Sequence, residues 1–257
     1  MKKRPNILTI AGFDPSNGAG LTADIKTMEA LKCYGLSVCT ANTIQNDITF
    51  KACYWTPLAI IKEQINVLFE RFPINYVKIG IVENWVVLND IIDLLIEKNT
   101  KIKIILDPVL TSSSEYDFHS NNQSKEFGIF DQTEFDIVLS KIYMLTPNYK
   151  EIQQLYPEKN IEETIEYISN KTNLFLKGGH NDKAIGVDTL FTGLGKKYNL
   201  NPKTESYSEK HGSGCVLSSA ITAFLAMNYP LLKACVKGKG YTEKVLSSNK
   251  SLLGYHG

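Results

Sequence analysis

A short run of small residues, His211-Gly212-Ser213-Gly214-Cys215, stands directly before a strongly apolar stretch that ends at Met227. If that stretch is a helix, the backbone N–H groups of Gly212, Ser213 and Gly214 converge with the positive end of the helix dipole on one small volume. Such a volume suits a phosphate group. The same residues also fit an ordinary helix start, because Gly/Ser turns commonly precede helices. The run alone is therefore weak evidence for an anion site.

Cys215 would lie in the first turn of this helix. At that position the dipole lowers the pKa of a thiol and favours the reactive thiolate. Val216 and Leu217 follow it, and such apolar surroundings are equally typical of a buried cysteine that serves packing. Taken by itself, Cys215 favours the packing role.

Asn148 and Glu151 follow Pro147 at a spacing that places both on one face of a helix. Together they would hold a hydrated Mg²⁺. The same pair is also the signature of a capping box, in which Asn148 caps the helix and Glu151 bonds back to the cap. The residue types leave both roles open.

Asp107 and Lys177 each end an apolar run, at 102–107 and 174–177. Because the carboxyl ends of parallel strands meet at one edge of a sheet, both charges are expected to face the same volume as Gly212. A cation, a carboxylate, a magnesium-binding face and a donor-rich helix start are the parts that phosphoryl transfer requires, since positioning and charge neutralisation supply most of its catalysis. The combination favours a kinase.

Short apolar runs alternate with longer stretches of helical period, which predicts one α/β domain over 1–257 with a parallel sheet. A polar loop is expected at 111–125, a hairpin at 187–200, and Gly35 is expected to end the first helix. The expected strands are 7–11, 37–41, 77–81, 102–107, 143–146 and 174–177. The expected helices include 21–28, 57–69, 87–95, 215–227 and 231–247.

The bulk composition excludes several classes of protein. With 28 basic and 27 acidic side chains, the net charge of +1 provides no general field to attract nucleic acid or anionic lipid. No stretch approaches the roughly 18 apolar residues of a membrane helix, and the N-terminal apolar run is short for a signal peptide. We therefore expect a cytoplasmic protein with no membrane or nucleic-acid partner.

Other common signatures are missing from the sequence. The five cysteines are scattered, without CxxC pairs or Cys/His clusters, so neither disulfides nor structural zinc are expected. The chain has no GxxxxGK[ST] motif and no HRD or DFG set, and Gly18-Ala19-Gly20 lacks the full GxGxxG pattern. The most common nucleotide-binding folds are therefore disfavoured.

Eight motifs occur in order along the chain: 11–20, 23–27, Gln45-Asn46, Lys78-Ile79-Gly80, Asp107-Pro108-Val109, Thr146-Pro147-Asn148, Lys177-Gly178-Gly179 and 211–215. Through these motifs the chain resembles, over nearly its whole length, the hydroxymethylpyrimidine and phosphomethylpyrimidine kinases of thiamine biosynthesis, members of the ribokinase-like superfamily. The resemblance implies a three-layer α/β/α fold with a central, mostly parallel sheet. It also implies ATP with Mg²⁺, and transfer first to 4-amino-5-hydroxymethyl-2-methylpyrimidine and then to its monophosphate. Relatives are often dimers, so a homodimer is expected.

By position in these motifs, six residues would line the pyrimidine pocket. The amide of Gln45 would pair with the ring nitrogen and the amino group, although Gln45 also fits an ordinary solvated loop residue. Asp24 fits equally well a helix cap or a structural salt bridge. The six residues are Gly12, Ala19, Asp24, Gln45, Ile81 and Val109.

The same resemblance assigns the phosphate machinery. Asp107 and Glu151 would hold Mg²⁺ through water, and the Gly212, Ser213 and Gly214 amides would stabilise the migrating phosphoryl group. Cys215 would face the substrate hydroxyl, where the wider superfamily commonly has aspartate, so the base is a thiolate or the step needs little base. The residues that would serve the phosphates and the metal are Asp107, Asn148, Glu151 and Lys177.

Three residues depart from the family pattern: Asn17 for glycine, Ser213 for threonine and Ile81 for methionine. A stiff branched chain at Ile81 reshapes the pocket wall and leaves the ring preference open. The alternative function is therefore a pyridoxal or pyridoxine kinase of vitamin B6 salvage. A third hypothesis is a catalytically inactive, pyrimidine-binding regulatory protein, which the retained Asp107, Lys177 and Cys215 disfavour.

Overall fold

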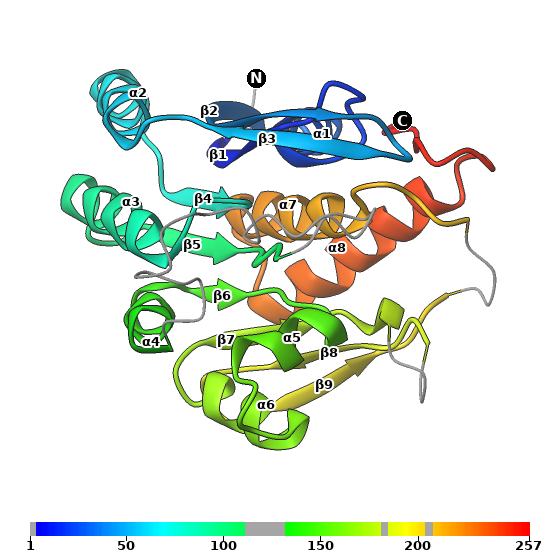
Figure 1. Ribbon diagram of the computed structural model, residues 1–257. Helices are drawn as coiled ribbons and strands as arrows, with labels where there is room; N and C mark the ends of the chain where they lie inside the picture. The colour runs from blue at the N-terminus through cyan, green and yellow to red at the C-terminus, as the bar shows by residue number, and fades with distance from the viewer. Residues whose placement is uncertain (1–3, 111–131, 181–184, 204–207) are drawn as a thin grey trace.

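The computed structural model describes residues 4–110, 132–180, 185–203 and 208–257. Within them nine strands form one sheet in the order β3-β2-β1-β4-β5-β6-β7-β8-β9 (Figure 1). The polar loop expected at 111–125 lies outside the described residues. None of the described helices is long and apolar enough to cross a membrane.

The centre of the sheet is parallel and both edges are antiparallel. The carboxyl ends of the parallel strands therefore lie along one edge, where the loops that follow them can meet. The parallel strands are β1 (Asn6–Phe13), β2 (Tyr34–Gln45), β4 (Tyr76–Ile79), β5 (Lys103–Leu106), β6 (Met144–Leu145) and β7 (Asn173–Leu176). The antiparallel additions are β3 (Phe50–Trp55), β8 (Asp188–Phe191) and β9 (Lys197–Leu200).

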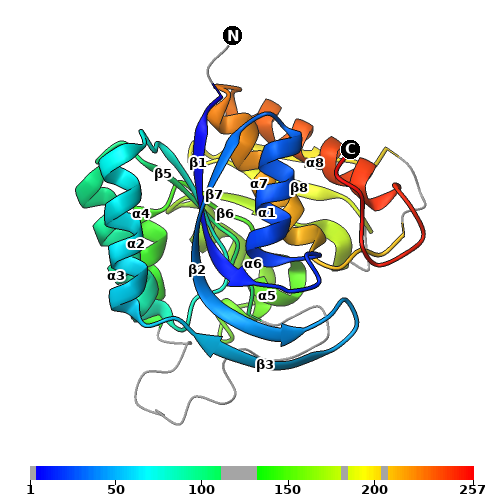
Figure 2. The same cartoon turned by 90° about the horizontal axis from the view of Figure 1, so that it is seen from above.

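Helices cover both faces of the sheet, which confirms the three-layer α/β/α prediction. One face carries α2 (Leu58–Arg71), α3 (Trp85–Lys98), α4 (Gln132–Lys141), α5 (Tyr149–Leu155) and α6 (Ile161–Ser169). The other carries α1 (Gly20–Ala30), α7 (Ser213–Ala226) and α8 (Leu231–Leu246). Figure 2 shows α1, α7 and α8 on the side of the strands opposite to α2, α3 and α4.

The apolar runs form strands because both of their faces are buried. In β5, Ile104 and Leu106 join the core under α2 to α6, while Ile105 points to the core under α7 and α8. Successive side chains of a strand point to opposite faces, so a strand covered on both sides is apolar at every position. In β1 the same alternation places Ile7 in a core cluster with Met28, while the next residue, Leu8, lies in the core on the other face of the sheet.

The first helix ends earlier than expected, so the prediction for Gly35 is wrong. Helix α1 ends at Ala30, and Lys32 takes the left-handed conformation at φ 63°. Gly35 lies in β2, where a Cβ would be 2.6 Å from Ile25 Cδ1 and close to Met28. Its lack of a side chain therefore serves close packing of helix on strand. The strand β3 carried no clear signal in the sequence.

Candidate active site

Asp107 and Lys177 form a buried ion pair at the carboxyl ends of β5 and β7. Lys177 Nζ lies 2.8 Å from Asp107 Oδ1, and Asp107 is fully buried. Burial by itself raises the pKa of Asp107, but the attraction of Lys177 and Lys78 outweighs it and holds that pKa below the ordinary value. Burial likewise lowers the pKa of Lys177, and the nearby carboxylates reverse the shift. Both groups are therefore charged at neutral pH.

The glycine-rich loop, residues 212–214, lies directly against the Asp107–Lys177 pair. Helix α7 begins at Ser213, with Gly212 as its N-cap at φ 73°. A Cβ built on Gly214 would lie 3.2 Å from Lys177 Nζ and 3.9 Å from Asp107 Oδ2. The structure thus brings the first turn of α7 to an ammonium group and a carboxylate that come from distant strands. Together they form a compact site for a phosphate group and its counter-charges.

Asn148 and Glu151 are a capping box and also reach the site. Asn148 Oδ1 accepts from the N–H of Lys150 and of Glu151, and Glu151 Oε2 accepts from Asn148 N at 2.7 Å. The same carboxylate oxygen lies 3.4 Å from Lys177 Nζ. Burial raises the pKa of Glu151 to about 7, against the opposing attraction of Lys177. Of the capping and magnesium-binding roles left open by the sequence, the capping role is therefore present. The Glu151 carboxylate also lies next to Lys177.

The carboxylates of Asp107 and Glu151 suit a cation that is bound through water molecules. Both oxygens of Asp107 already accept bonds, from Lys177 and Thr146 on one side and from Ser218 on the other. No three His, Cys, Asp or Glu side chains among the described residues gather as a metal-binding cluster. Mg²⁺ usually keeps several waters and binds proteins through one or two carboxylates plus substrate phosphates. Asp107 and Glu151 fit that water-mediated mode.

Asp24 is fully buried in a structural ion pair. It pairs with Lys78 at 2.8 Å between Oδ2 and Nζ, and both side chains are fully buried. Thr9 Oγ1 donates to Asp24 Oδ2 at 2.6 Å, and Ser219 Oγ donates to Oδ1 at 2.7 Å. Of the roles open to Asp24, the structural salt bridge is the one present. Its partner Lys78 received no role from the sequence.

Cys215 lies in the first turn of α7, but its thiol is not activated. Burial raises the pKa of the Cys215 thiol to about 11, and the attraction of Lys78 only partly opposes this. Asp24 and Asp107 add to the rise, because their charges would repel a thiolate. The lowered pKa expected from the helix start is therefore not found, and desolvation is the physical reason.

Of the residues expected at the pyrimidine, Ala19 lies beside the glycine-rich loop, and Gly12 lies next to Ile81. A Cβ on Gly12 would be 2.4 Å from Ile81 Cδ1, so the two residues are in contact. A Cβ on Gly212 would lie 2.6 Å from Ala19 Cα, which places that residue against the same loop. Val109 is two residues after Asp107, beyond Pro108, and is half-buried.

Gln45 stands apart from these four, at the end of β2. Its Nε2 donates to Thr43 Oγ1 at 2.8 Å, and Thr43 in turn donates to Phe13 O. These bonds orient the amide next to the end of β1.

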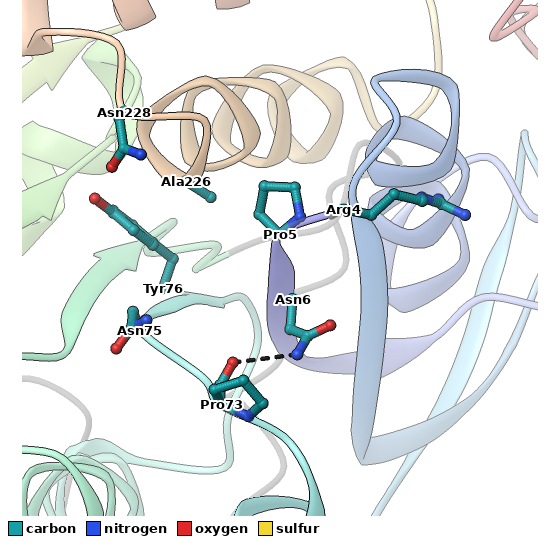
Figure 3. Close-up of a pocket in the computed structure, with 8 residues that line it drawn as sticks. All are labelled: Arg4, Pro5, Asn6, Pro73, Asn75, Tyr76, Ala226 and Asn228. Atoms are coloured by element: carbon teal, nitrogen blue, oxygen red, sulfur yellow. Dashed lines mark hydrogen bonds between the residues drawn. The ribbon is translucent and has the colours of Figure 1, made fainter. Parts of the chain in front are cut away.

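One hollow among the described residues, of about 340 Å³, lies far from these groups (Figure 3). It is at the amino ends of β1 and β4, where Asn6 Nδ2 donates to Pro73 O at 3.2 Å. The paired charges of the site lie at the opposite, carboxyl edge. The lining residues are Arg4, Pro5, Asn6, Pro73, Asn75, Tyr76, Ala226 and Asn228.

Another hollow, of about 370 Å³, lies between β9 and α8. Lys239, which lines it, donates to Asp188 Oδ2 at 2.9 Å. The other oxygen of Asp188 accepts from Gly178 N, the residue after Lys177. Two hydrogen bonds thus connect the hollow to the phosphate site. Its remaining lining residues are Tyr198, Asn199, Leu200, Asn201, Lys203, Leu232 and Val236.

A mostly parallel sheet between two helical layers, with a buried Asp–Lys pair against a glycine-rich helix start, defines a ribokinase-like kinase. The family model of phosphomethylpyrimidine kinase matches residues 14–257, so the chain belongs to this family. The resemblance seen in the sequence is therefore confirmed.

Individual relatives agree with this membership. The hydroxymethylpyrimidine/phosphomethylpyrimidine kinase of Aquifex aeolicus is 34% identical over 96% of this chain and 97% of its own length. The solved phosphomethylpyrimidine kinase of Clostridium difficile 630 is 32% identical, with a TM-score of 0.72 over 93% of this chain and 98% of that chain. Several other curated relatives are longer, and the chain spans about half of their length.

A pyridoxal kinase shares the fold as well. The Staphylococcus aureus enzyme, solved in complex with pyridoxal, gives a TM-score of 0.78 at 24% identity, over 95% of this chain and 88% of that chain. At this level of identity the likeness concerns the fold, because one fold hosts many substrates.

Proposed function

We propose that the chain transfers the γ-phosphoryl group of ATP to 4-amino-5-hydroxymethyl-2-methylpyrimidine, and then a second one to the monophosphate, in thiamine biosynthesis. The observation that carries the proposal is the contact of Gly214 with the Asp107–Lys177 pair. It joins a cation, a carboxylate and backbone donors in one volume, as phosphoryl transfer requires. Membership of the phosphomethylpyrimidine kinase family supports the choice of acceptor.

The chain's own charges would stabilise the transferring group. Lys177 stays protonated because Asp107 and Glu151 raise its pKa against the effect of burial. Its ammonium lies next to Gly214, where the amides of the first turn of α7 offer further donors. These fixed dipoles and charges need no reorganisation when negative charge moves along the reaction path. When bound, Mg²⁺ supplies further charge neutralisation, and Asp107 and Glu151 would hold it through water.

The acceptor ring would lie among Gly12, Ala19, Ile81 and Val109, beside the glycine-rich loop. The absence of a side chain at Gly12 leaves room for the Ile81 side chain to form one wall. Gln45 uses one N–H on Thr43, so its carbonyl oxygen and second N–H remain for an amino group and a ring nitrogen. This pairing suits an aminopyrimidine.

Cys215 would contact the acceptor hydroxyl as a neutral thiol. Its pKa of about 11 leaves little thiolate at neutral pH. A loose, metaphosphate-like transition state asks little of a base, because the hydroxyl proton can leave late. The residue then acts by shape and by weak hydrogen bonding.

The hollow between β9 and α8 is our candidate for the adenine of ATP. Leu200, Leu232 and Val236 offer an apolar surface for a planar base. Its connection to Lys177 through Asp188 and Gly178 would place the phosphates toward the glycine-rich loop. Leu232→Asp would weaken ATP binding without changing the KM for the pyrimidine, and equal effects on both would contradict the assignment.

Pyridoxal is the alternative acceptor, because Ile81 replaces the methionine frequent in this pocket wall. A coupled assay with purified enzyme would compare kcat/KM for the pyrimidine alcohol and for pyridoxal. We expect at least about tenfold preference for the pyrimidine, the scale that a few contacts in a pocket supply. A higher kcat/KM for pyridoxal would replace our first choice, and no turnover of either compound would favour a regulatory binding protein.

We also propose a cytoplasmic homodimer. All five cysteines are free, which fits a reducing compartment. Strand β3 stands at one end of the described sheet, and Ile44, Ile48 and Tyr54 on the β2–β3 ribbon are exposed. Edge strands with exposed apolar side chains favour pairing with a second copy.

A further inference from the structure

Asp14 organises the loop that leads from β1 to α1. Its carboxylate is 1% exposed and accepts from Ser16 N at 2.8 Å, Ser16 Oγ at 2.9 Å, Gly18 N at 3.1 Å and Ala19 N at 2.8 Å. Burial by itself raises the pKa of Asp14, but these bonds and a bond from His211 outweigh it and lower the pKa. The loop 14–19 therefore folds around an ionised carboxylate. It ends at Ala19, a residue expected to line the acceptor site.

His211 reaches the same carboxylate from the other side of the site. Its Nε2 lies 3.0 Å from Asp14 Oδ2, and the residue is 8% exposed. An ionised carboxylate can only accept, so Nε2 carries the proton and donates. The backbone N–H of His211 is bound to Leu252 O at 2.9 Å, which anchors the residue from behind.

The two loops also touch through their backbones. His211 directly precedes Gly212, where a Cβ would be 2.2 Å from Gly18 O and 2.6 Å from Ala19 Cα. A Cβ on Gly18 would in turn lie 2.5 Å from His211 Cδ2. The acceptor loop, residues 14–19, and the glycine-rich loop, residues 212–214, are thus in close contact, and the Asp14–His211 hydrogen bond spans that contact.

The second ring nitrogen of His211 points to a role beyond packing. In the described part of the chain, Nδ1 is buried and has no hydrogen-bond partner. A buried polar atom without a partner costs stability, and an apolar side chain would avoid that cost. The imidazole therefore has to be explained by the bond that its Nε2 makes to Asp14.

We infer that His211 is a positioning residue: through Asp14 it holds the acceptor loop 14–19 in register with the glycine-rich loop 212–214. The inference rests on the proposed function, in which Ala19 lines the acceptor site and the 212–214 amides bind the transferring group. Phosphoryl transfer depends on in-line placement of the acceptor, and a displacement of about 1 Å costs on the order of 100-fold in rate. Loss of the link should therefore act on the transfer step and spare nucleotide binding.

The test compares His211→Leu with His211→Gln. Leucine fills the space but cannot donate, whereas the glutamine Nε2 can reach Asp14. We expect kcat with the pyrimidine alcohol to fall about 10- to 100-fold in His211→Leu, with the Kd of ATP within about twofold of wild type. His211→Gln should recover most of the loss. His256→Leu is the matched control, because that histidine contacts Thr27 and Tyr241 away from both loops.

A second measurement does not depend on activity. Hydrogen exchange of the amides of Ser16, Gly18 and Ala19 should accelerate in His211→Leu and stay near wild type in His211→Gln. If His211→Leu does not fold, His211→Asn takes its place, since its shorter amide does not reach Asp14. Unchanged kcat and exchange, equal losses in the leucine and glutamine variants, or parallel weakening of ATP binding would each overturn the inference. Wild-type enzyme without activity on the pyrimidine would instead refute the proposed function, and the exchange data would still test the link.

Discussion

Cys215 keeps its proton in the free enzyme, and this property can be measured. A general base with a pKa of about 11 would make kcat rise almost tenfold per pH unit well below that pKa. We predict instead that kcat changes little between pH 8 and 10. Cys215→Ala should lower kcat by about tenfold or less and leave the Kd of ATP unchanged, as expected for lost contacts rather than a lost base.

Cys39→Ala is the control for this experiment, because Cys39 is also half-buried and lies in β2. A log kcat that climbs with unit slope in the wild type, and loses that slope in Cys215→Ala, would restore the thiolate as the base.

The raised pKa of Glu151 predicts a specific pH dependence of the free energy of unfolding. Its carboxyl pKa is about 7 in the folded protein, mainly through burial, against about 4.3 in an unfolded chain. Between these values the folded state keeps a proton that the unfolded state has lost. The free energy of unfolding should therefore fall as pH rises from about 4.3 to 7, by at most about 1.4 kcal/mol per pH unit for this one group.

Glu151→Gln isolates the contribution, because the amide oxygen can still accept from Asn148 N. Urea unfolding of both proteins at several pH values gives the difference. We expect the wild type to lose stability relative to the variant across this window, and a constant difference would show that Glu151 does not titrate there.

Helix α7 is the element that joins the two buried ion pairs. Its adjacent serines bind different aspartates: Ser218 Oγ donates to Asp107 Oδ2 and Ser219 Oγ donates to Asp24 Oδ1. One helical turn thus connects the residue after β5 with helix α1. The start of α7 is positioned from both sides, which is what a rigid set of backbone donors needs.

The Lys78–Asp24 pair should dominate the stability of this arrangement. Lys78→Met leaves Asp24 charged and buried, which typically costs about 3–5 kcal/mol. The double variant Lys78→Met/Asp24→Asn should recover part of this loss, because no buried charge remains. Lys62→Met is the control, since its pair with Asp90 is exposed and should be worth less than about 1 kcal/mol. Thermal unfolding measures all four proteins.

Gly212→Ala tests the packing of the glycine-rich loop. Its φ of 73° is unfavourable for alanine, and the new Cβ would lie 2.2 Å from Gly18 O. The loops must separate, so we expect kcat to fall about 100-fold by misplacement of the site. Gly193→Ala is the matched control, because its Cβ would meet no atom within 4 Å. A Gly212→Ala enzyme with normal kcat would show that the loop tolerates separation.

At the level of the whole molecule, the β2–β3 ribbon decides the proposed assembly. Tyr54 is 61% exposed and pairs across the ribbon with Asn42, two residues from the exposed Ile44. Charges and lysines on such surfaces suppress edge pairing. Size-exclusion chromatography with light scattering should therefore give a dimer for the wild type and a monomer for Tyr54→Lys. A monomeric wild type, or an unaffected Tyr54→Lys dimer, would place the interface elsewhere or remove it.

Much of the architecture was predictable because parallel strands buried on both faces must be apolar throughout. The runs ending at Asp107 and Lys177 therefore marked both a strand and the position of a charge. Strand β3 was not predicted, since a half-exposed edge strand has no such run. The end of α1 was misplaced because Gly35 serves close packing with Ile25 and Met28, and a glycine has the same signature in either role.

By itself the sequence determined the α/β class with its parallel sheet and the order of the motifs, since these depend on local residue types and their spacing, and the resemblance carried by those motifs supplied the kinase family and the three layers. Pairing and protonation were decided only by the tertiary structure. Asp24 meets Lys78 and Asp14 meets His211 across long stretches of chain, and no local pattern encodes such contacts. The thiol pKa of Cys215 depends on the burial and the charges around it, and those exist only once the strands and α7 have come together.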